Sequence, residues 1–310
     1  MLSGGASGCA SVAAGGARAA RAGCAGAGGC ELGCGEAFCG HGHVHGVQQF
    51  GARRLRANAR GLNSLDANLY ALTHRGNPGD VEHYVALCRG ASSVLELGSG
   101  YGRILTALAE PTRTLFGLEL DPALLRLGQK AVAALPARRQ KSVTIVRGNM
   151  QFFELGRRFE RVLLPYNALY CLLNLRAVEQ CFRAVRAALE PGGLFAFDVW
   201  NADRLGEEVL APVDEDQALA AFEHGGRRWV AFESCRSGRV PQRLDVTYTY
   251  VPQGRAARRS QVVQQRYYRS AELLALLRKC GFSVQAKLGG FAGARFSERA
   301  QRLVVVARAD

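Results

Sequence analysis

The segment 94–104, Val-Leu-Glu-Leu-Gly-Ser-Gly-Tyr-Gly-Arg-Ile, constrains the fold of this chain more than any other. Its first residues are largely apolar, which is typical of a strand buried in a sheet. Gly98, Gly100 and Gly102 follow, and a helix is expected from about Gly102 to Glu110. Glycine adopts positive φ and lets a ligand approach the backbone, and a helix N-terminus favours an anionic group. The segment therefore predicts a strand, a ligand-binding turn and a helix.

Two classes of ligand use such a turn. A dinucleotide site has the pattern G-x-G-x-x-G, but here Arg103 stands where the third glycine would be, and Gly102 comes one residue earlier. Glu96 is an acid that a nicotinamide site does not need. The pattern E-x-G-x-G-x-G resembles the first motif of the class I S-adenosylmethionine-dependent methyltransferases, in which the turn passes under the methionine part of the cofactor and the acid helps to hold its amino group. A glycine-rich turn without a ligand is the alternative.

A second motif supports the same family. A buried strand is expected at 114–120, followed by a helix from Pro122 to Leu135, and Glu119 stands at the end of that strand. A carboxylate at this place accepts both ribose hydroxyls in many adenosine-binding sheets. The residues around Glu119 are similar to the family's second motif, so the resemblance implies that Glu119 binds the ribose.

The next two strands are expected at 142–150 and 159–164. The family usually has Asp where this chain has Asn149, whose amide oxygen can accept the same bond from the adenine amino group. Met150 is expected against the adenine ring, with plain core packing as the alternative. Residues 165–167, Pro-Tyr-Asn, follow the fourth strand and should face the methyl group, because ligands of open α/β sheets lie outside the carboxyl ends of the strands.

Other features separate this chain from well-known methyltransferase classes. Residues 165–167 are not the Asn/Asp-Pro-Pro-Tyr motif of enzymes that methylate base amino groups, and Cys171 does not follow a proline as a cytosine-C5 nucleophile does. The pair of glutamates of the protein arginine methyltransferases is also missing. An amphipathic helix over 175–189 leads into Leu-Glu-Pro-Gly-Gly at 189–193, which resembles the family's late Leu-x-Pro-Gly-Gly motif before a fifth strand.

The pattern changes after Ala202. Segments 228–234, 244–251 and 260–268 alternate apolar and polar residues, which predicts a three-stranded antiparallel sheet with one wet face. A helix at 270–280 and a terminal hairpin of strands follow. An insert at this place resembles the bacterial small-molecule methyltransferases that include the sugar N,N-dimethyltransferases. The resemblance implies an α/β fold with a Rossmann-like, seven-stranded, mostly parallel sheet, helices on both faces, and a small antiparallel insert after the fifth strand.

Residues 70–76, Tyr-Ala-Leu-Thr-His-Arg-Gly, resemble the N-terminal cover that small-molecule methyltransferases fold over the cofactor's carboxylate. Arg75 is therefore a candidate contact, and a solvent-exposed helix end is the alternative.

The expected cofactor is S-adenosylmethionine, and no metal is expected. The expected cofactor-binding residues are Tyr70, Glu96, Gly98, Ser99, Gly100, Gly102, Arg103, Glu119, Leu120, Asn149, Met150 and Pro165. The sulfonium methyl is already activated, so a base is needed only if the acceptor arrives protonated. Candidates for that catalytic role are His74, Tyr166, Tyr267 and Tyr268.

The chain carries a net charge of +14 and has a pI near 9.7, with arginines clustered in the insert. Three function classes follow. The first is a small-molecule methyltransferase whose lid favours an acidic acceptor, and the second is an RNA methyltransferase that uses the basic stripe on phosphates. The third is a methyltransferase-fold binding protein without catalysis. The missing base-amino motif and the lack of an added RNA-binding module favour the first, while arginine on a solvated face also explains the charge. The sequence does not indicate an oligomeric state.

The N-terminal residues 1–61 differ from the rest of the chain. They are rich in Gly, Ala, Cys and Arg, and cannot bury enough apolar surface to offset the entropy of ordering. We expect a disordered extension, followed by a methyltransferase domain at 62–310 with the insert at about 202–268. The extension has no acid before Glu31 and resembles an organelle transit peptide, with a non-functional upstream extension as the alternative. The protein is accordingly expected in the cytoplasm, or in an organelle matrix if the extension is a transit peptide.

Cysteine is spread over both parts of the chain. Five of the ten cysteines lie in the domain, where they are interpreted as small core residues in a reducing compartment. The others lie in the extension, and three of them stand close to histidines at 41, 43 and 45. Their spacing matches no standard C-x2-C zinc finger, so adventitious metal binding is favoured over a folded zinc site. No run of residues approaches the roughly 18–20 apolar residues of a membrane span, and no membrane partner is expected.

The composition of the extension generates a prediction. A truncated protein that begins near Leu62 is expected to bind S-adenosylmethionine as the full chain does, because the motif residues all lie later. Isothermal titration calorimetry on the two proteins measures this. A loss of affinity of ten-fold or more would show that the extension takes part in the cofactor site.

Overall fold

The computed structural model describes residues 66–205, 213–237, 240–254 and 256–310. The expected extension at 1–61, with its cysteines and histidines, lies outside the described residues, as do Arg239 and Arg255. The main-sheet strands are β1 (Ser93–Leu97), β2 (Thr114–Glu119), β3 (Val143–Arg147), β4 (Phe159–Leu164), β5 (Leu189–Trp200), β10 (Phe282–Leu288) and β11 (Arg302–Ala309). The helices are α2 (Ala67–Thr73), α3 (Asp80–Leu87), α4 (Arg103–Leu108), α5 (Pro122–Ala133), α6 (Ala137–Gln140), α7 (Leu175–Ala188) and α8 (Ser270–Lys279), with 3-10 turns η1 (Ala168–Cys171) and η2 (Ala202–Arg204).

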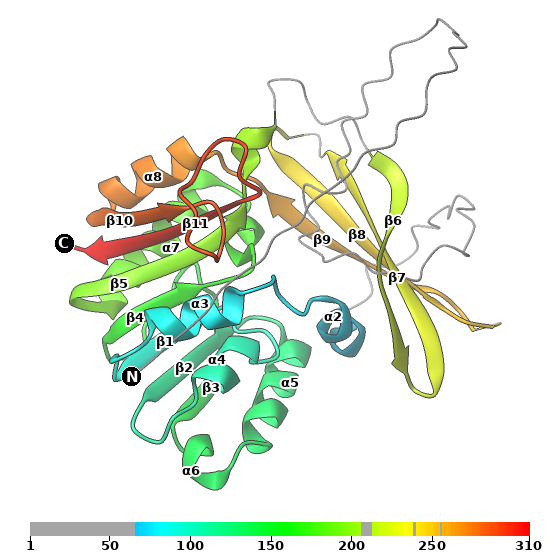
Figure 1. Ribbon diagram of the computed structural model, residues 1–310, viewed down its shortest axis with the longest axis horizontal. Helices are drawn as coiled ribbons and strands as arrows, with labels where there is room; N and C mark the ends of the chain where they lie inside the picture. Colours follow the sequence, from blue (N-terminus) through cyan, green and yellow to red (C-terminus); the bar gives the residue numbers. More distant parts are fainter. Residues whose placement is uncertain (1–65, 206–212, 238–239, 255) are drawn as a thin grey trace, which may run out of the picture. The chain divides into compact units, whose positions relative to one another are not determined.

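The seven strands form one sheet in the order β10-β11-β5-β4-β1-β2-β3 (Figure 1). β1 pairs in parallel with β2 and β4, and β3 and β5 extend the parallel part on either side. β11 is antiparallel to both of its neighbours, β5 and β10. The expected seven-stranded, mostly parallel sheet with a terminal hairpin is confirmed. β5 begins at Leu189 and therefore includes the Pro-Gly-Gly segment, which was expected to precede the strand.

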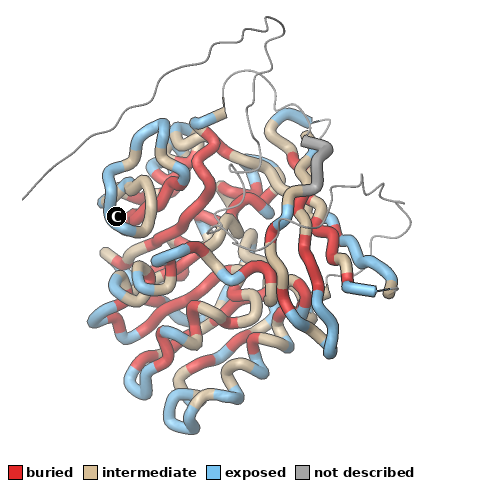
Figure 2. The backbone as a smooth tube through the Cα atoms, turned by 45° about the vertical axis from the view of Figure 1, so that its right-hand side comes forward, coloured by how far each residue is buried: buried red, intermediate tan, exposed pale blue. Residues whose placement is uncertain are grey.

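Alternate residues of the central strands pack against helices on opposite faces of the sheet. Leu95 and Leu97 of β1 belong to a cluster with residues of α7 and α8, whereas Val94 belongs to a second cluster with residues of α3 and α4. The central strands are buried, as Figure 2 shows by the colour of the backbone, because both of their faces are covered. This places the carboxyl ends of β1, β2, β4 and β5 at one edge of a rigid core. In the described part of the chain, none of the helices is long and apolar enough to cross a membrane.

The insert lies between β5 and α8, as expected, but it has four strands instead of three. They are β6 (Val213–His224), β7 (Arg227–Ser237), β8 (Arg243–Pro252) and β9 (Arg259–Arg266), antiparallel in that order. β6 was not predicted, because its segment is rich in acids and alanines, residues that are depleted in strands. Pairing with β7 outweighs that weak propensity. The last strand also ends before Tyr267 and Tyr268, which fall in the connection to α8.

One face of the inserted sheet, which we call the inner face, packs on α2. Leu69 of α2 lies in a hydrophobic cluster with Trp229, Tyr248 and Tyr250 of the insert. Successive residues of a strand point to opposite faces, so the inner face of β8 carries the even-numbered residues from Leu244 to Tyr250. The contact is also polar, since the Asp66 amide donates to Gln261 at 3.1 Å. The insert is thereby attached to the segment that precedes the main sheet.

A buried arginine ties the ends of α3 and α4 together. The guanidinium of Arg113, which is 7% exposed, donates to three carbonyl oxygens, those of Cys88, Ala91 and Leu108, at 2.9–3.1 Å. Helix C-termini leave carbonyl groups without intrahelical partners, and water cannot reach these. Arg113 therefore provides the hydrogen bonds that allow both helix ends to be buried.

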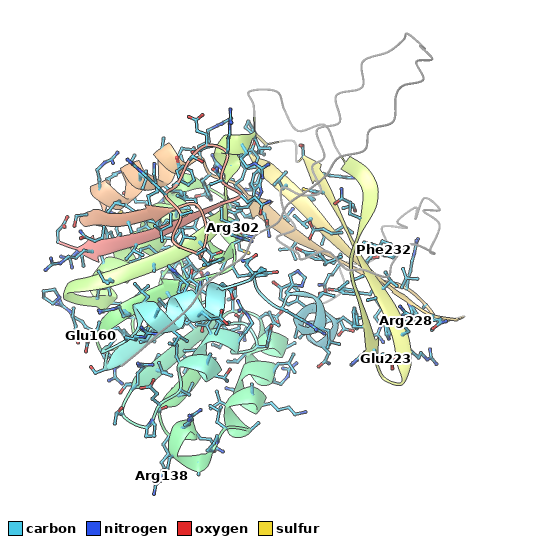
Figure 3. The ribbon with its side chains drawn as sticks, viewed as in Figure 1. Arg138, Glu160, Glu223, Arg228, Phe232 and Arg302 are labelled. Carbon is cyan, nitrogen blue, oxygen red and sulfur yellow. The ribbon has the colours of Figure 1, made fainter. Side chains whose placement is uncertain are left out.

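Replacing this arginine tests its structural role. Arg113→Met is expected to lower the free energy of unfolding by about 2–4 kcal/mol, because it leaves buried carbonyl groups without a donor. Arg138→Met on the exposed helix α6 (Figure 3) serves as the control and should change stability by less than about 0.5 kcal/mol. Urea denaturation followed by circular dichroism measures both. Equal stability of the two variants would contradict the role of Arg113.

Candidate active site

The glycine turn after β1 has the backbone conformation that its residues predict. Gly98, Gly100 and Gly102 have φ values of 63°, 56° and 83°, a region that side chains with a Cβ rarely adopt. The Ser99 amide donates to the Leu118 carbonyl at 3.1 Å, which joins the turn to the end of β2. The turn is therefore a fixed backbone loop at the carboxyl edge of the sheet.

Glu119 closes this loop from the end of β2. Its Oε2 accepts from the Gly100 amide at 2.7 Å, and its Oε1 accepts from the Asp121 amide at 2.8 Å. Burial raises the pKa of Glu119, and these backbone donors oppose that rise. Each carboxylate oxygen keeps a second lone pair. The residue can therefore hold the glycine turn and still accept hydrogen bonds from the two hydroxyls of a ribose.

A cavity of about 740 Å³ opens between this edge of the main sheet and the inner face of the insert. Its lining includes eleven of the twelve expected cofactor residues, and the twelfth, Gly102, belongs to the turn itself. The candidates His74 and Tyr166 line it as well. The cofactor residues on its wall are Tyr70, Glu96, Gly98, Ser99, Gly100, Arg103, Glu119, Leu120, Asn149, Met150 and Pro165.

Glu96 faces the cavity from inside β1 and is almost completely buried, at 2% exposure. Burial raises the pKa of Glu96 to about 8, although the nearby guanidinium of Arg103 opposes the rise. Its Oε2 has no hydrogen-bond partner within the described part of the chain. A buried acceptor without a donor is costly. A cationic amino group in the cavity would supply the missing donor, so Glu96 fits the amino group of S-adenosylmethionine.

Arg103, the first residue of α4, also faces the cavity. Its guanidinium donates to both carboxylate oxygens of Asp80, at 2.7 and 2.8 Å, and Asp80 is 1% exposed. A bidentate ion pair of this kind fixes the plane of the guanidinium. The remaining N–H groups suit a carboxylate, such as that of the cofactor's methionine part. Arg75 differs, because its side chain is exposed, donates to the Leu72 carbonyl at 3.0 Å and does not line the cavity.

The adenine end of the expected site is more open. Leu120 is 57% exposed although it is apolar, and it lines the cavity with Asn149 and Met150. The Asn149 Oδ1 already accepts from the Gln151 amide at 2.9 Å, so its second lone pair is the one left for an adenine amino group. Leu120 and Met150 give an aromatic ring apolar surface on which to lie. The arrangement is compatible with adenine binding.

Tyr166 and Asn167 form a strained turn at the end of β4. Both have φ of 58°, a conformation that costs non-glycine residues about 1–3 kcal/mol each. The Tyr166 amide donates to Asp198 Oδ1 at 2.8 Å, and the Trp200 amide donates to Asn167 Oδ1 at 2.6 Å. These bonds to β5 hold the turn in its strained form, which places Tyr166 on the cavity wall.

A buried charge network supports that turn. Asp198 is fully buried, and it accepts from the Tyr84 hydroxyl at 2.7 Å and from Arg302 of β11 at 3.2 Å (Figure 3). Burial raises the pKa of Asp198, while Arg302 and the Tyr84 hydroxyl oppose the rise. Arg302 also donates to the side-chain oxygen of Asn77, and the backbone amide of Asn77 donates to Asp80 at 2.9 Å. The network therefore links the turn at Tyr166 to the partner of Arg103.

Four aromatic rings meet at the acceptor side of the cavity. Tyr70 stacks on His74 with 3.7 Å between ring centroids, and Tyr248 of the insert meets the His74 ring edge-on at 4.5 Å. Tyr166 is 6.2 Å from His74. The His74 Nδ1 lies 3.0 Å from the Tyr70 carbonyl and 2.9 Å from the Thr73 hydroxyl, so this ring nitrogen is held by α2.

Tyr267 and Tyr268, the other two catalytic candidates, do not line the cavity. Tyr268 is 1% exposed, its hydroxyl donates to the Leu172 carbonyl, and its ring lies 6.1 Å from that of Tyr170. Tyr267 packs at the edge of the hydrophobic clusters. Both residues follow the end of β9, so the strand alternation that suggested them does not reach their positions.

The structure also brings to the site residues that the sequence did not indicate. Asp80, Asp198 and Arg302 come from distant segments, and no local pattern marks them. Glu233 and Tyr248 of the insert line the cavity, and their places in alternating strands were the only signal for them. Cys171, interpreted from the sequence as a core residue, is instead exposed on the cavity wall.

The ribose assignment predicts the effect of removing one carboxylate. Glu119→Ala is expected to weaken S-adenosylmethionine binding by about 2–4 kcal/mol, because two ribose hydroxyls lose a charged acceptor. Glu82→Ala on the exposed side of α3 should leave affinity unchanged. Calorimetry on both variants measures the difference. Saturable NAD binding without S-adenosylmethionine binding would instead support a dinucleotide site.

Comparison with known proteins agrees with this geometry. Residues 94–193 match the family described as a methyltransferase domain. The CcbJ methyltransferase from Streptomyces caelestis is 26% identical, with a TM-score of 0.65 over 75% of this chain and 90% of that chain. S-adenosylmethionine-bound CalS10 from Micromonospora echinaspora, an amino pentose methyltransferase at 22% identity, shares the fold, with a TM-score of 0.59 over 81% of this chain and 100% of that chain.

A curated relative extends the comparison. The dTDP-3-amino-3,6-dideoxy-alpha-D-glucopyranose N,N-dimethyltransferase of Streptomyces fradiae is 29% identical over 142 residues, which are 43% of this chain. The matched part spans about half of that relative, 52% of its length. The solved structures share the fold over most of this chain. Residues 94–193 therefore form a methyltransferase domain, and the chain as a whole resembles S-adenosylmethionine-dependent small-molecule methyltransferases, with a separate four-stranded antiparallel sheet inserted after the fifth strand.

Proposed function

We propose that this protein transfers the methyl group of S-adenosylmethionine directly to an amine nitrogen of a small-molecule acceptor. The observation that carries the proposal is a single cavity in which the cofactor residues continue into an aromatic, acidic region under the insert. Two of the curated relatives are named as N,N-dimethyltransferases of amino sugars. An amino sugar or a similar polar amine fits a region of this kind.

The charge of the cavity favours an amine over an acid. Among the described residues that line it, the acidic side chains and the strongly basic one are Glu96, Arg103, Glu119, Asp121 and Glu233. Four of these are acids, and the one cation is already paired with Asp80. An anionic acceptor would therefore meet carboxylates, whereas a cationic or neutral amine would meet acceptors for its N–H groups.

The arginines of the insert, which suggested an acidic acceptor or RNA, have other contacts. Arg243 donates to the Leu173 carbonyl at 3.0 Å, and Arg266 lies over the Tyr268 ring at 5.2 Å. Arg259 lies over Trp229 at 5.6 Å and pairs with Asp66. These three arginines do not line the cavity. Their contacts support a packing role, and the proposal therefore assigns them no part in acceptor binding.

The chain's residues have mainly to hold and orient the reactants. When bound, S-adenosylmethionine supplies an activated methyl group, whose C–S bond breaks as the nitrogen lone pair forms the N–C bond. Glu96, Glu119 and Arg103 hold the two ends of the cofactor, and the aromatic rings exclude water from the acceptor. His74, which lines the cavity, is the proposed base for an acceptor that arrives protonated. Burial raises the pKa of Tyr166 far above neutral, so this phenol stays protonated and acts as a hydrogen-bonding group.

A labelled-methyl assay tests the proposal. We expect transfer from methyl-labelled S-adenosylmethionine to amino sugars such as 3-amino-3-deoxy-D-glucose and no transfer to D-glucose, because a hydroxyl is a weaker nucleophile than an amine. Bulk transfer RNA is included as the competing acceptor. Mass spectrometry of the products locates the methyl group. Labelling of the RNA alone, or of D-glucose alone, would contradict the proposal.

A further inference from the structure

Glu233 belongs to a row of side chains that runs across neighbouring strands on the inner face of the insert. On β7 it stands directly opposite Tyr248 of β8, which in turn stands opposite Gln261 of β9. Residues that face each other in antiparallel strands point to the same side of the sheet. Tyr248 belongs to the cluster around Leu69 and contacts His74, so this row points toward α2 and the cavity.

The carboxylate of Glu233 is buried at the cavity wall. The residue is 7% exposed and lines the cavity together with Val246, Tyr248 and Gln265 of the neighbouring strands. Burial raises the pKa of Tyr166, Arg302 opposes that rise, and the negative charge of Glu233 adds to it. The carboxylate therefore acts electrostatically on Tyr166, another side chain that lines the cavity.

The surroundings of this carboxylate suit a cation. The rings of Tyr70, His74, Tyr166 and Tyr248 lie together on the same side of the cavity, with centroid separations of 3.7–6.4 Å between the paired rings. Aromatic faces attract ammonium groups, and a carboxylate shielded from water forms strong hydrogen bonds with N–H donors. A carboxylate next to several aromatic rings is a recognition element for amino groups.

We propose that Glu233 binds the amino group of the methyl acceptor and sets the preference of this protein for amines over alcohols. The inference rests on the proposed function and assigns to it a residue of the insert. In the reactive complex, the neutral amine donates one N–H to Glu233 while its lone pair points to the methyl group. As the N–C bond forms and the C–S bond breaks, positive charge passes from sulfur to nitrogen, and Glu233 stabilises it there. The methylated nitrogen then releases a proton to solvent or keeps it as an ammonium product.

Substitution of this carboxylate by its amide gives the sharpest test. Glu233→Gln keeps the size of the side chain and removes its charge, while Glu233→Asp keeps the charge on a shorter side chain. Glu223→Gln, at an exposed position near the end of β6 (Figure 3), is the matched control. Each protein is assayed with methyl-labelled S-adenosylmethionine and three amines: 3-amino-3-deoxy-D-glucose, glucosamine and cyclohexylamine. Calorimetry gives the affinity of each protein for S-adenosylmethionine.

We expect Glu233→Gln to lower kcat/KM for the amines ten-fold or more, through both a lower kcat and a higher KM, with cofactor affinity within two-fold of the wild type. The kcat/KM of Glu233→Asp should lie between those of Glu233→Gln and the wild type, and the kcat/KM of Glu223→Gln should equal that of the wild type. Equal kcat/KM in Glu233→Gln and the wild type would overturn the inference while leaving the proposed function intact. A joint loss of activity and cofactor affinity in the Gln and Asp variants would overturn it as well, because the residue would then be structural. A wild type that methylates none of the amines would instead overturn the proposed function.

Discussion

The buried carboxylate of Asp198 is the constraint on which the arrangement of the site depends. It accepts hydrogen bonds from α3, from the end of β4 and from β11, through Tyr84, Tyr166 and Arg302. A fully buried charge is tolerated only when its lone pairs are matched in this way. The same bonds hold Tyr166 and Asn167 at positive φ, a conformation that these residues would not keep in a free loop. The conformation of the cavity wall at Tyr166 therefore depends on the position of the C-terminal strand β11.

The main sheet and the inserted sheet contribute different residues to the cavity. The main sheet contributes Glu96 and Glu119 from strands that are packed on both faces, so the cofactor positions are as rigid as the core. The insert contributes Glu233 and Tyr248 from a sheet that packs on α2 along one face. Side chains on that face can change without disturbing the glycine turn. A change of acceptor during evolution therefore needs no change in the cofactor residues.

The order of strands could be predicted from local pattern, and the same pattern brought eleven of the twelve proposed cofactor residues to one cavity. Glu119 stands a fixed distance after the glycine turn, and the two features belong to neighbouring parallel strands. β6 could not be predicted, because pairing with β7 overrides a sequence that is acidic and rich in alanine. Asp80, Asp198 and Arg302 were also missed, since they meet only after the sheet has formed. Tyr267 and Tyr268 were selected from an alternation that ends at Arg266, which is where β9 ends.

The charge of the whole chain and the charge of its cavity have opposite signs, and the difference bears on which ligands the cavity binds. The chain carries a net charge of +14, yet the described cavity wall has four acids and one arginine. S-adenosylmethionine brings a sulfonium and an ammonium group, whereas the thioether left after transfer has lost the sulfonium charge. Carboxylates in the cavity attract S-adenosylmethionine, with its two cationic groups, more strongly than they attract the thioether product. The cavity thus favours the cofactor over its product, and Glu233 lies on the side of the cavity where the new positive charge would form.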